Sequence, residues 1–493
     1  MQYLLQIKAL IDALKDWLYL VLITKKLNSF LGILLLVCVC VLIGGFVAVL
    51  ELKGAIFAIA VVFAITSVLF ALFNQYTCLY IVLTLGCLVP WLSKIRDMPY
   101  GISLDALLMT MSLGILMKQS YKRDLSFLRS PITIPIVLWI VYNLIQVLNP
   151  SAVSQLAWVY TVRSVAILHL LYFIACYALN SYRRIVSVFK FMLFMAFVAA
   201  IYGLGQEYIG FSRYEMIWLH SDMERFQLIF QWGRLRIFSF FSDPTNFGMY
   251  LSYYAVIGCI LLTGPFKTWQ KVAIGFSAAC MFLAMGLAGS RTPFILVPFG
   301  LIIFTLLTLN KKVILTMIFT FMLGSVFMLK STNNAIIFRI QSAFSSTSSD
   351  TMDVRLNNQK MIQPFIRAHP FGAGLGSAGQ WGARFAPNSI LAKFPPDSGF
   401  VRIAVELGWL GLILYFYLLF KVVNFSIHCY LRVRHPKVKI IYLSLTVMIF
   451  MLFLASYPQE AIIQLPTSLC FYVTLAIIAR LKDFEHEAYL EDG

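Results

Sequence analysis

Six charged side chains stand out. Five lie within or near long apolar runs, where an ionised group is costly unless it is paired, and one lies in the long segment before the last three runs. They are Arg236, Arg291, Arg355, Asp397, Arg402 and Glu406. Guanidinium groups bind anions, and a carboxylate can accept a proton from a reacting hydroxyl. The set therefore suggests chemistry on an anionic substrate.

Two of the arginines precede or begin apolar runs. Arg291 lies in the short turn AGSRTPF, and Arg236 precedes the aromatic run in RIFSFFSDPTNFGMY. An arginine can hold a phosphate through two parallel hydrogen bonds, which a lysine cannot do. An interfacial arginine can also simply extend its head group towards water, and Asp243 before Pro244 is expected to cap a helix. The residues alone leave both interpretations open for Arg236 and favour anion binding by Arg291.

The stretch FPPDSGFVRIAVELGWLG contains the other cluster. Asp397 and Ser398 stand where a helix N-cap belongs, so capping alone could explain Asp397. Arg402 and Glu406 are four residues apart, on one helix face, and we expect them to pair. The two glycines of GWLG allow close packing of helices. These separate explanations do not account for the set as a whole, because the membrane topology derived below places Arg236, Arg291, Arg355 and Asp397 on one side of the membrane.

The elements that position these residues are membrane helices. The chain has 493 residues, of which 60% are hydrophobic and only 12% are charged, too few to cover a soluble core. Its apolar runs are near the ~20 residues that a bilayer-spanning helix needs. We predict an all-α, polytopic bundle of about 12–14 membrane helices with a large extracytoplasmic loop that contains short helices. The runs are 31–50, 55–73, 76–93, 102–117, 131–149, 162–180, 185–206, 247–264, 272–288, 293–309, 313–330, 402–422, 439–457 and 462–480.

The net charge of +18 reports topology. With the N-terminus in the cytoplasm, 21 of the 39 lysines and arginines fall in cytoplasmic segments, and four fall in the short loops of the other side. This bias follows the positive-inside rule and places both termini in the cytoplasm. Because topology accounts for the basic composition, we expect no nucleic-acid binding.

The chain divides by composition into three parts. Residues 1–30 carry four lysines on an amphipathic pattern, and we expect an interfacial segment on the inner leaflet rather than a cleaved signal peptide. Residues 31–480 form the membrane domain. Residues 481–493 form a cytoplasmic tail.

Two long outside segments, 207–246 and 331–400, interrupt the short connections of this domain, and long loops on a rigid scaffold are often functional. The second contains GLGSAG, which has the glycine spacing of a dinucleotide loop but no strand–turn–helix context. We interpret it as a tight turn that lets backbone amides approach a substrate. Asp350 and Asp353 in DTMD lack further ligands, so we expect no metal site and no cofactor.

Three stretches together resemble the bacterial O-antigen ligase and polymerase superfamily of multi-pass glycosyltransferases. They are RIFSFFSDPTNFGMYL, GSRTPFILVPFGLIIF, and RLNNQKMIQPFIRAHPFGAGLGSAG followed by DSGFVRIAVELGWLGLILYF. The resemblance covers about residues 200–425. Residues 1–200 are similar to the family only in hydropathy.

The resemblance implies transfer of a glycan from a polyprenyl diphosphate carrier to an acceptor glycan, on the outer face of the bacterial cytoplasmic membrane. It implies that Arg236 and Arg291 bind the diphosphate, with Arg355 as a third contact. Arginines can stabilise the charge of a departing diphosphate without a metal ion. A base is also needed for the acceptor hydroxyl. Asp397 would be that base, and Arg402 and Glu406 would orient the helix start behind it.

The sequence departs from the ligase pattern at one position. Ligases usually have histidine and then asparagine where this chain has Asp397 and Ser398, whereas polymerases more often have an acidic residue. We therefore predict a polymerase of O-antigen or exopolysaccharide repeat units, with chain-length regulators or flippases as possible partners. The alternative enzyme is a ligase that moves finished glycan to a lipid core, as in lipopolysaccharide, or to a protein.

A transporter is the alternative from another class. It would bury ionisable residues at mid-membrane depth in several helices, whereas Asp105, His169 and Lys190 are isolated in the sequence.

Overall fold

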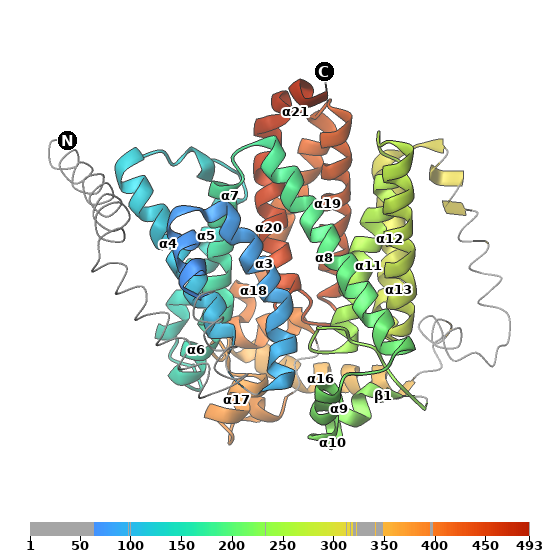
Figure 1. Ribbon diagram of the computed structural model, residues 1–493. Coiled ribbons are helices and arrows are strands. Elements are labelled where there is room, and N and C mark those ends of the chain that lie inside the picture. Colours follow the sequence, from blue (N-terminus) through green and yellow to red (C-terminus); the bar gives the residue numbers. More distant parts are fainter. Residues whose placement is uncertain are drawn as a thin grey trace, which may run out of the picture. The chain divides into compact units, whose positions relative to one another are not determined.

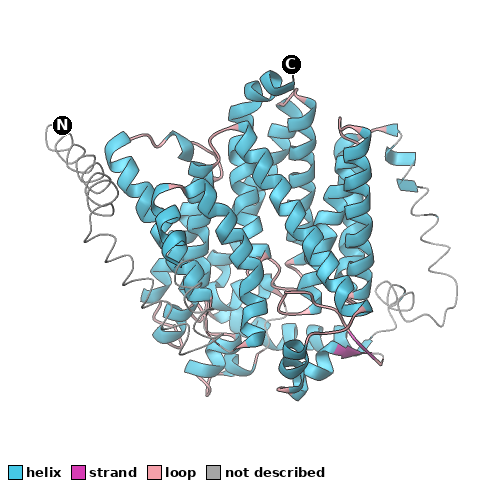
Figure 2. Ribbon diagram, in the orientation of Figure 1, coloured by secondary structure: helices cyan, strands magenta, loops and turns pink. Residues whose placement is uncertain are grey.

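The computed structural model describes residues 64–96, 98, 100–231, 233–311, 313–315, 317, 318, 322, 341, 349–394 and 398–492. These residues are almost entirely helical, and within them the only strands are two of two residues each, which pair in one ribbon (Figure 2). Eight of the described helices are long and apolar enough to cross a membrane. The protein is therefore an all-α, multi-pass membrane protein, as predicted.

The structure places a helix at each predicted run that it describes. The run 31–50 lies outside the described residues, as does most of 313–330. The elements are α3 (Gln75–Ile95), α4 (Gly101–Lys122), η2 (Ser126–Leu128), α5 (Thr133–Ile145), η3 (Gln146–Leu148), α6 (Gln155–Val162), η4 (Arg163–Ile167), α7 (Leu168–Ala178), α8 (Tyr182–Tyr208), α9 (Arg213–His220), α10 (Met223–Ile229), β1 (Phe230–Gln231), β2 (Arg234–Leu235), α11 (Pro244–Leu262), α12 (Thr268–Leu287), α13 (Arg291–Thr308), α16 (Ser349–Ala368), α17 (Gly379–Phe385), η5 (Ile390–Lys393), α18 (Gly399–Arg432), α19 (Pro436–Ala455), α20 (Thr467–Arg480), η6 (Leu481–Phe484) and α21 (Glu485–Asp492).

The chain forms two compact units, residues 1–78 with 110–126 and residues 79–109 with 127–493. In the first, an apolar helix over Ala64–Phe73 precedes α3. Lys118 Nζ donates to Phe73 O and to Gln75 Oε1, both at 2.7 Å, and so ties the end of α4 to the start of α3. Polar side chains thus close the join between these helices.

The second unit contains the core of the protein, which is built around α11 and α19. In these two helices 83% and 78% of the most apolar window is buried, against 22% in α12 and 28% in α13. Helices that are apolar on every side occupy a core, and those with one open apolar face line its lipid-facing surface. Helix α19 packs against α11, α13 and α18. It is therefore the common neighbour of the helices that contain Arg291 and Arg402.

The long segments gather at one end of this unit, which we call the loop end. Figure 1 shows α9, α10, α16 and α17 there, and α21 at the opposite end. Helices α11, α13 and α18 begin at the loop end, whereas α8, α12 and α19 end there.

The predicted tail, 481–493, is helical through Asp492 and packs on the opposite end. Glu487 accepts from Tyr182 N at 2.8 Å, and Glu485 accepts from Arg434 N and His435 N.

The two long segments are more ordered than their composition suggests. Residues 207–246 contain α9, α10 and the β1–β2 ribbon, around an apolar cluster of Leu219, Ile229 and Phe238. The second segment contains the short helices α17 and η5, as expected, and also the 20-residue helix α16. Ile362 and Ile366 of α16 pack in one cluster with Ala404 and Val405 of α18. The segment therefore folds back on the helix that follows it.

Candidate active site

Arg236 is buried at the loop end, with only 8% of its surface exposed. Its Nε donates to the carbonyl oxygen of Ala288 at 2.9 Å, and its Nη1 donates to that of Leu228 at 3.4 Å. Ala288 is the C-cap of α12, so this arginine joins the folded segment 207–246 to the α12–α13 turn. The interpretation of Arg236 as an arginine that extends into water is therefore wrong.

Arg291 is the first residue of α13 and lies three positions after Ala288. Its side chain is exposed, and the described part of the chain gives it no hydrogen bond or ion pair. The first N–H groups of a helix carry a partial positive charge, which favours anions beside them. The structure thus brings Arg236 to the turn that presents Arg291.

The chain between Arg236 and α11 is held by buried polar groups that the sequence did not suggest. Gln206 Oε1 accepts from the N–H groups of Phe238 and Ser239 at 3.1 and 2.7 Å, and its Nε2 donates to Glu215 at 2.7 Å. Lys94 Nζ donates to Ser239 O at 3.3 Å and lies 3.9 Å from the centre of the Phe238 ring. These contacts fix the backbone directly after Arg236.

Asp243 caps α11, as predicted. It accepts from the N–H groups of Thr245 and Asn246 at 2.8 and 2.9 Å and from Asn246 Nδ2 at 2.6 Å. These bonds account for the DPTN motif, and they leave Asp243 as an anchor of the helix start.

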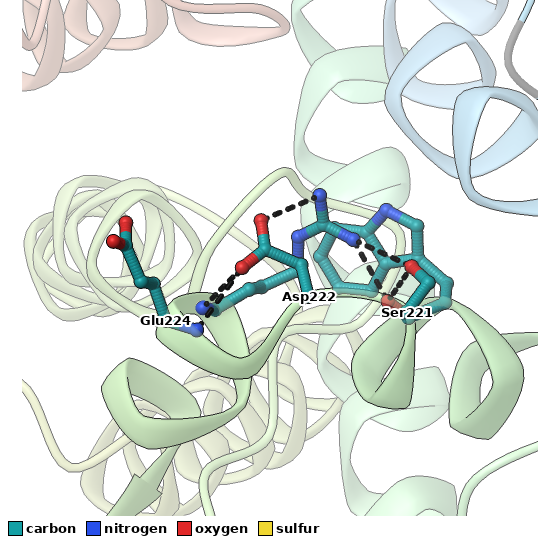
Figure 3. A network of polar contacts seen from close by, with 5 residues as sticks. Ser221, Asp222 and Glu224 are labelled. Carbon is teal, nitrogen blue, oxygen red and sulfur yellow. Dashed lines mark hydrogen bonds and ion pairs between the residues drawn. The ribbon is translucent and has the colours of Figure 1, made fainter.

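Arg225, in the same segment, is used for structure. Asp222 caps α10 through the N–H groups of Glu224 and Arg225, as Figure 3 shows. The guanidinium of Arg225 then returns to Asp222 at 3.4 Å and donates to the carbonyl of Trp218 and to Ser221. This network closes the α9–α10 turn.

The predicted pair of Arg402 and Glu406 is present, with Arg402 Nε 3.1 Å from Glu406 Oε1. A second carboxylate joins it, because Arg402 Nη1 lies 2.6 Å from Glu460 Oε2. All three side chains are at most 16% exposed. A buried guanidinium between two carboxylates has two charge-assisted bonds that offset its desolvation.

Glu460 belongs to the loop between α19 and α20, which also contacts the start of α18 directly. The N–H group of Gly399 donates to the carbonyl of Ser456 at 3.0 Å. The sequence analysis did not single out Glu460, although it is a carboxylate that closely follows the strongly apolar helix α19.

Helix α18 is broken at Gly408, where φ is 69° and ψ is −169°. This backbone conformation is essentially restricted to glycine. A side chain at Gly408 would overlap the carbonyl of Pro370. The carbonyls freed by the break are bound by other groups, since Val405 O accepts from Ala373 N and Leu407 O from the hydroxyl of Tyr142. The GWLG motif therefore serves a helix break and not only close packing.

The glycine-rich turn is buried against protein. Residues 372–378 are all buried. A side chain at Gly376 would overlap Thr161 and Ala157 of α6, and one at Gly374 would crowd Ala152. The prediction that this turn offers its amides to a substrate is therefore wrong, since its glycines allow the turn to approach α6 and α18.

Two predicted site residues are placed only in part or not at all. Arg355 lies in α16, the helix that packs on the first turns of α18. Asp397 lies outside the described residues. The next residue, Ser398, is the N-cap of α18, and its buried hydroxyl has no hydrogen-bond partner in the part of the chain that the structure describes.

Polar residues that looked isolated in the sequence have neighbours. Asp105 pairs with Arg163 at 2.8 Å. The buried ring of His169 contacts the Tyr472 hydroxyl at 3.1 Å, and it lines an internal cavity of about 50 Å³ together with Arg402 and Glu406.

The site places an exposed arginine at the start of α13 and a buried arginine at the turn before it. Helix α18, which carries Arg402, packs against α19, as α13 does. Helices α11, α13 and α18 begin at the loop end, where α19, which packs against all three, ends. An exposed arginine at a helix start favours the binding of an anion there.

Comparison with known proteins finds one family that part of the chain matches. Residues 276–416, from within α12 into α18, match the family described as O-antigen ligase. None of the curated proteins matches the chain. The family supports a membrane glycosyltransferase activity of the ligase or polymerase type. The part of the chain that contains Arg291 and Arg402 therefore matches the O-antigen ligase family.

Proposed function

We propose that this protein polymerises polysaccharide repeat units from a polyprenyl diphosphate-linked donor, on the outer face of the bacterial cytoplasmic membrane. One observation carries the proposal. Arg236 is bonded to the turn before Arg291, so two arginines from distant parts of the sequence lie near one helix start. Lipid-linked sugars carry their diphosphate at the membrane boundary, where this helix begins.

In the proposed reaction the acceptor hydroxyl attacks the anomeric carbon of the donor glycan. The bond between that carbon and the diphosphate oxygen breaks, and its electron pair leaves with the diphosphate. Arg291 would bind the diphosphate oxygens directly. Arg236 would add its charge and hold the turn, and Arg355 would be a third contact. Preorganised cations of this kind stabilise the developing negative charge.

The proton of the attacking hydroxyl must be removed as the new glycosidic bond forms. We assign it to the carboxylate of Asp397, two residues before α18. Arg402, held by Glu406 and Glu460, would fix the first turns of that helix. The role of Asp397 rests on the family resemblance, and that of Arg402 on the resemblance together with its position in the first turns of α18.

A ligase is the second candidate, and the description of the matching family favours it. Both enzymes use the same donor and differ in the acceptor. The aspartate at 397, where ligases usually have histidine, supports the polymerase. Chain-length regulators and flippases would be partners of either enzyme.

The test uses purified protein in lipid nanodiscs with a polyprenyl diphosphate-linked repeat unit. Products longer than one unit without added acceptor support polymerisation. Transfer only to an added lipid core or protein supports the ligase. The Arg291→Ala and Asp397→Asn variants should each abolish transfer. Unchanged transfer in both would overturn the site.

A further inference from the structure

Three aromatic rings from two elements form a cluster at the loop end. Tyr160 of α6 lies 5.0 Å from both Trp381 and Phe385 of α17, measured between ring centres. The planes of the two α17 rings differ by only 16°, and each is inclined by 31° to that of Tyr160. Nearly parallel rings present their faces in similar directions. We call these three residues the aromatic cluster.

The cluster remains open to its surroundings. Tyr160 is 43% exposed, and Trp381 and Phe385 are half-buried. Arg384 is exposed and holds its guanidinium 5.5 Å from the centre of the Phe385 ring and 6.0 Å from that of Trp381. The described part of the chain gives Arg384 no hydrogen bond, so its donors can reach a ligand that lies on the rings.

A buried turn connects the aromatic cluster to the candidate site. The turn before α17 packs on α6 through Gly376, next to Thr161, which directly follows Tyr160. Leu375, in the same turn, lines the internal cavity together with Arg402 and Glu406. The first turns of α18 and the aromatic cluster are therefore held by one buried segment.

We propose that Tyr160, Trp381 and Phe385 form a carbohydrate-binding surface that takes a pyranose ring of the glycan chain, with Arg384 donating to its hydroxyl or carboxylate oxygens. The face of a pyranose ring carries weakly positive C–H groups, which pack against the negative face of an aromatic ring. The guanidinium group supplies fixed donors beside that face. This inference rests on the proposed function and names a site for sugars away from the bond that reacts.

A membrane anchor is the competing role, because tryptophan and tyrosine also gather at membrane boundaries. The geometry favours sugar. The three rings are packed on one another beside an arginine, whereas Phe371 and Ile390 of the same segment are 57% and 83% exposed and lie outside the cluster. Phe371→Ala is therefore a matched control for removal of an aromatic ring.

The experiment measures binding without catalysis. Oligosaccharides of one, two and three repeat units, released from the producing strain's own polysaccharide, are titrated by equilibrium dialysis into the full-length protein in nanodiscs. We expect affinity to rise with length in the wild type. Trp381→Ala and Arg384→Gln should lower the affinity for the longest oligosaccharide about tenfold. Phe371→Ala should not change it, and Trp381→Phe should restore most of it.

The arms separate the possible failures. Equal affinity for oligosaccharide in the wild type and in Trp381→Ala would contradict the proposed carbohydrate-binding surface. The same holds if Trp381→Ala binds oligosaccharide normally and is only retained less well in the nanodisc, as a membrane anchor would predict. If Trp381→Ala does not fold, Arg384→Gln decides alone, because its side chain is exposed. If the protein binds oligosaccharides but does not transfer lipid-linked repeat units, the carbohydrate-binding surface is supported and the proposed function is contradicted. The same variants assayed with lipid-linked oligosaccharide show whether the bound glycan is the donor or the acceptor chain.

Discussion

At the scale of single residues, the two arginines of the site differ in what holds them. Arg236 is buried and donates to two backbone carbonyls, whereas Arg291 is exposed at the first position of α13. A buried donor that serves the fold contributes to stability, while an exposed one that serves a substrate does not.

Replacing Arg291 by Ala should therefore leave stability within about 0.5 kcal/mol of the wild type but lower the transfer rate at least about 100-fold. Replacing Arg236 by Ala should lower the free energy of unfolding by about 1–3 kcal/mol, because the carbonyls of Ala288 and Leu228 lose their donor. Thermal unfolding in detergent measures the stability of both variants, and the nanodisc transfer assay measures their transfer rates. A destabilised Arg291→Ala variant with normal transfer would contradict this assignment.

The second prediction at this scale concerns Arg402 and its two carboxylates. Removing Glu460 leaves a buried guanidinium with one partner, so Glu460→Ala should lower the free energy of unfolding by about 3 kcal/mol. In a double-mutant cycle with Arg402→Met, the two losses should be strongly non-additive. Glu224→Ala is the control, because Glu224 is exposed at the first turn of α10. Additive losses would show that the two side chains do not interact.

Residue spacing predicted part of this cluster. Arg402 and Glu406 are one helical turn apart, so their pairing follows from the sequence alone. Glu460 is 58 positions from Arg402, and no periodicity connects them. The burial of Arg236 depends in the same way on a carbonyl 52 positions ahead. Contacts between distant segments are set by tertiary packing, which local patterns do not contain.

At the scale of elements, apolar run length predicted the helices because a bilayer allows few other structures. It did not predict the break in α18. A glycine in an apolar helix indicates close packing, and only the approach of Pro370 and Gly372 shows that Gly408 adopts a positive φ. The break separates a short first segment, 399–407, from the rest of α18. That segment is positioned by its own contacts and not by helix continuity.

Gly408→Ala should therefore lower the free energy of unfolding by about 3 kcal/mol or more, because alanine is strained at this φ and its methyl group would overlap Pro370. Gly205→Ala in α8 is the matched control. A side chain there meets nothing within 4 Å, so it should stabilise by about 0.5–1 kcal/mol. Chemical unfolding in mild detergent measures both. A neutral Gly408→Ala variant would mean that α18 is continuous.

At the scale of the whole molecule, the candidate site depends on where the loop end lies. The segments that contain Arg236, Arg291 and Arg402 meet at that end of the second unit, and α21 lies at the other (Figure 1). The distribution of lysine and arginine predicts that the loop end faces outward and α21 faces the cytoplasm. A lipid diphosphate donor on the outer face can reach the site only in this orientation.

Cysteine labelling in intact cells tests the orientation directly. Asn388 and Glu491 are exposed, in the loop after α17 and in α21 respectively, so either can be replaced by cysteine with little cost to the fold. We expect a membrane-impermeant maleimide to label Asn388→Cys in intact cells and Glu491→Cys only after the membrane is opened. The wild-type protein, treated in the same way, is the control for labelling of the nine native cysteines. The reverse pattern would place Arg291 in the cytoplasm, away from any donor on the outer face, and the proposed reaction would then have no substrate at this site.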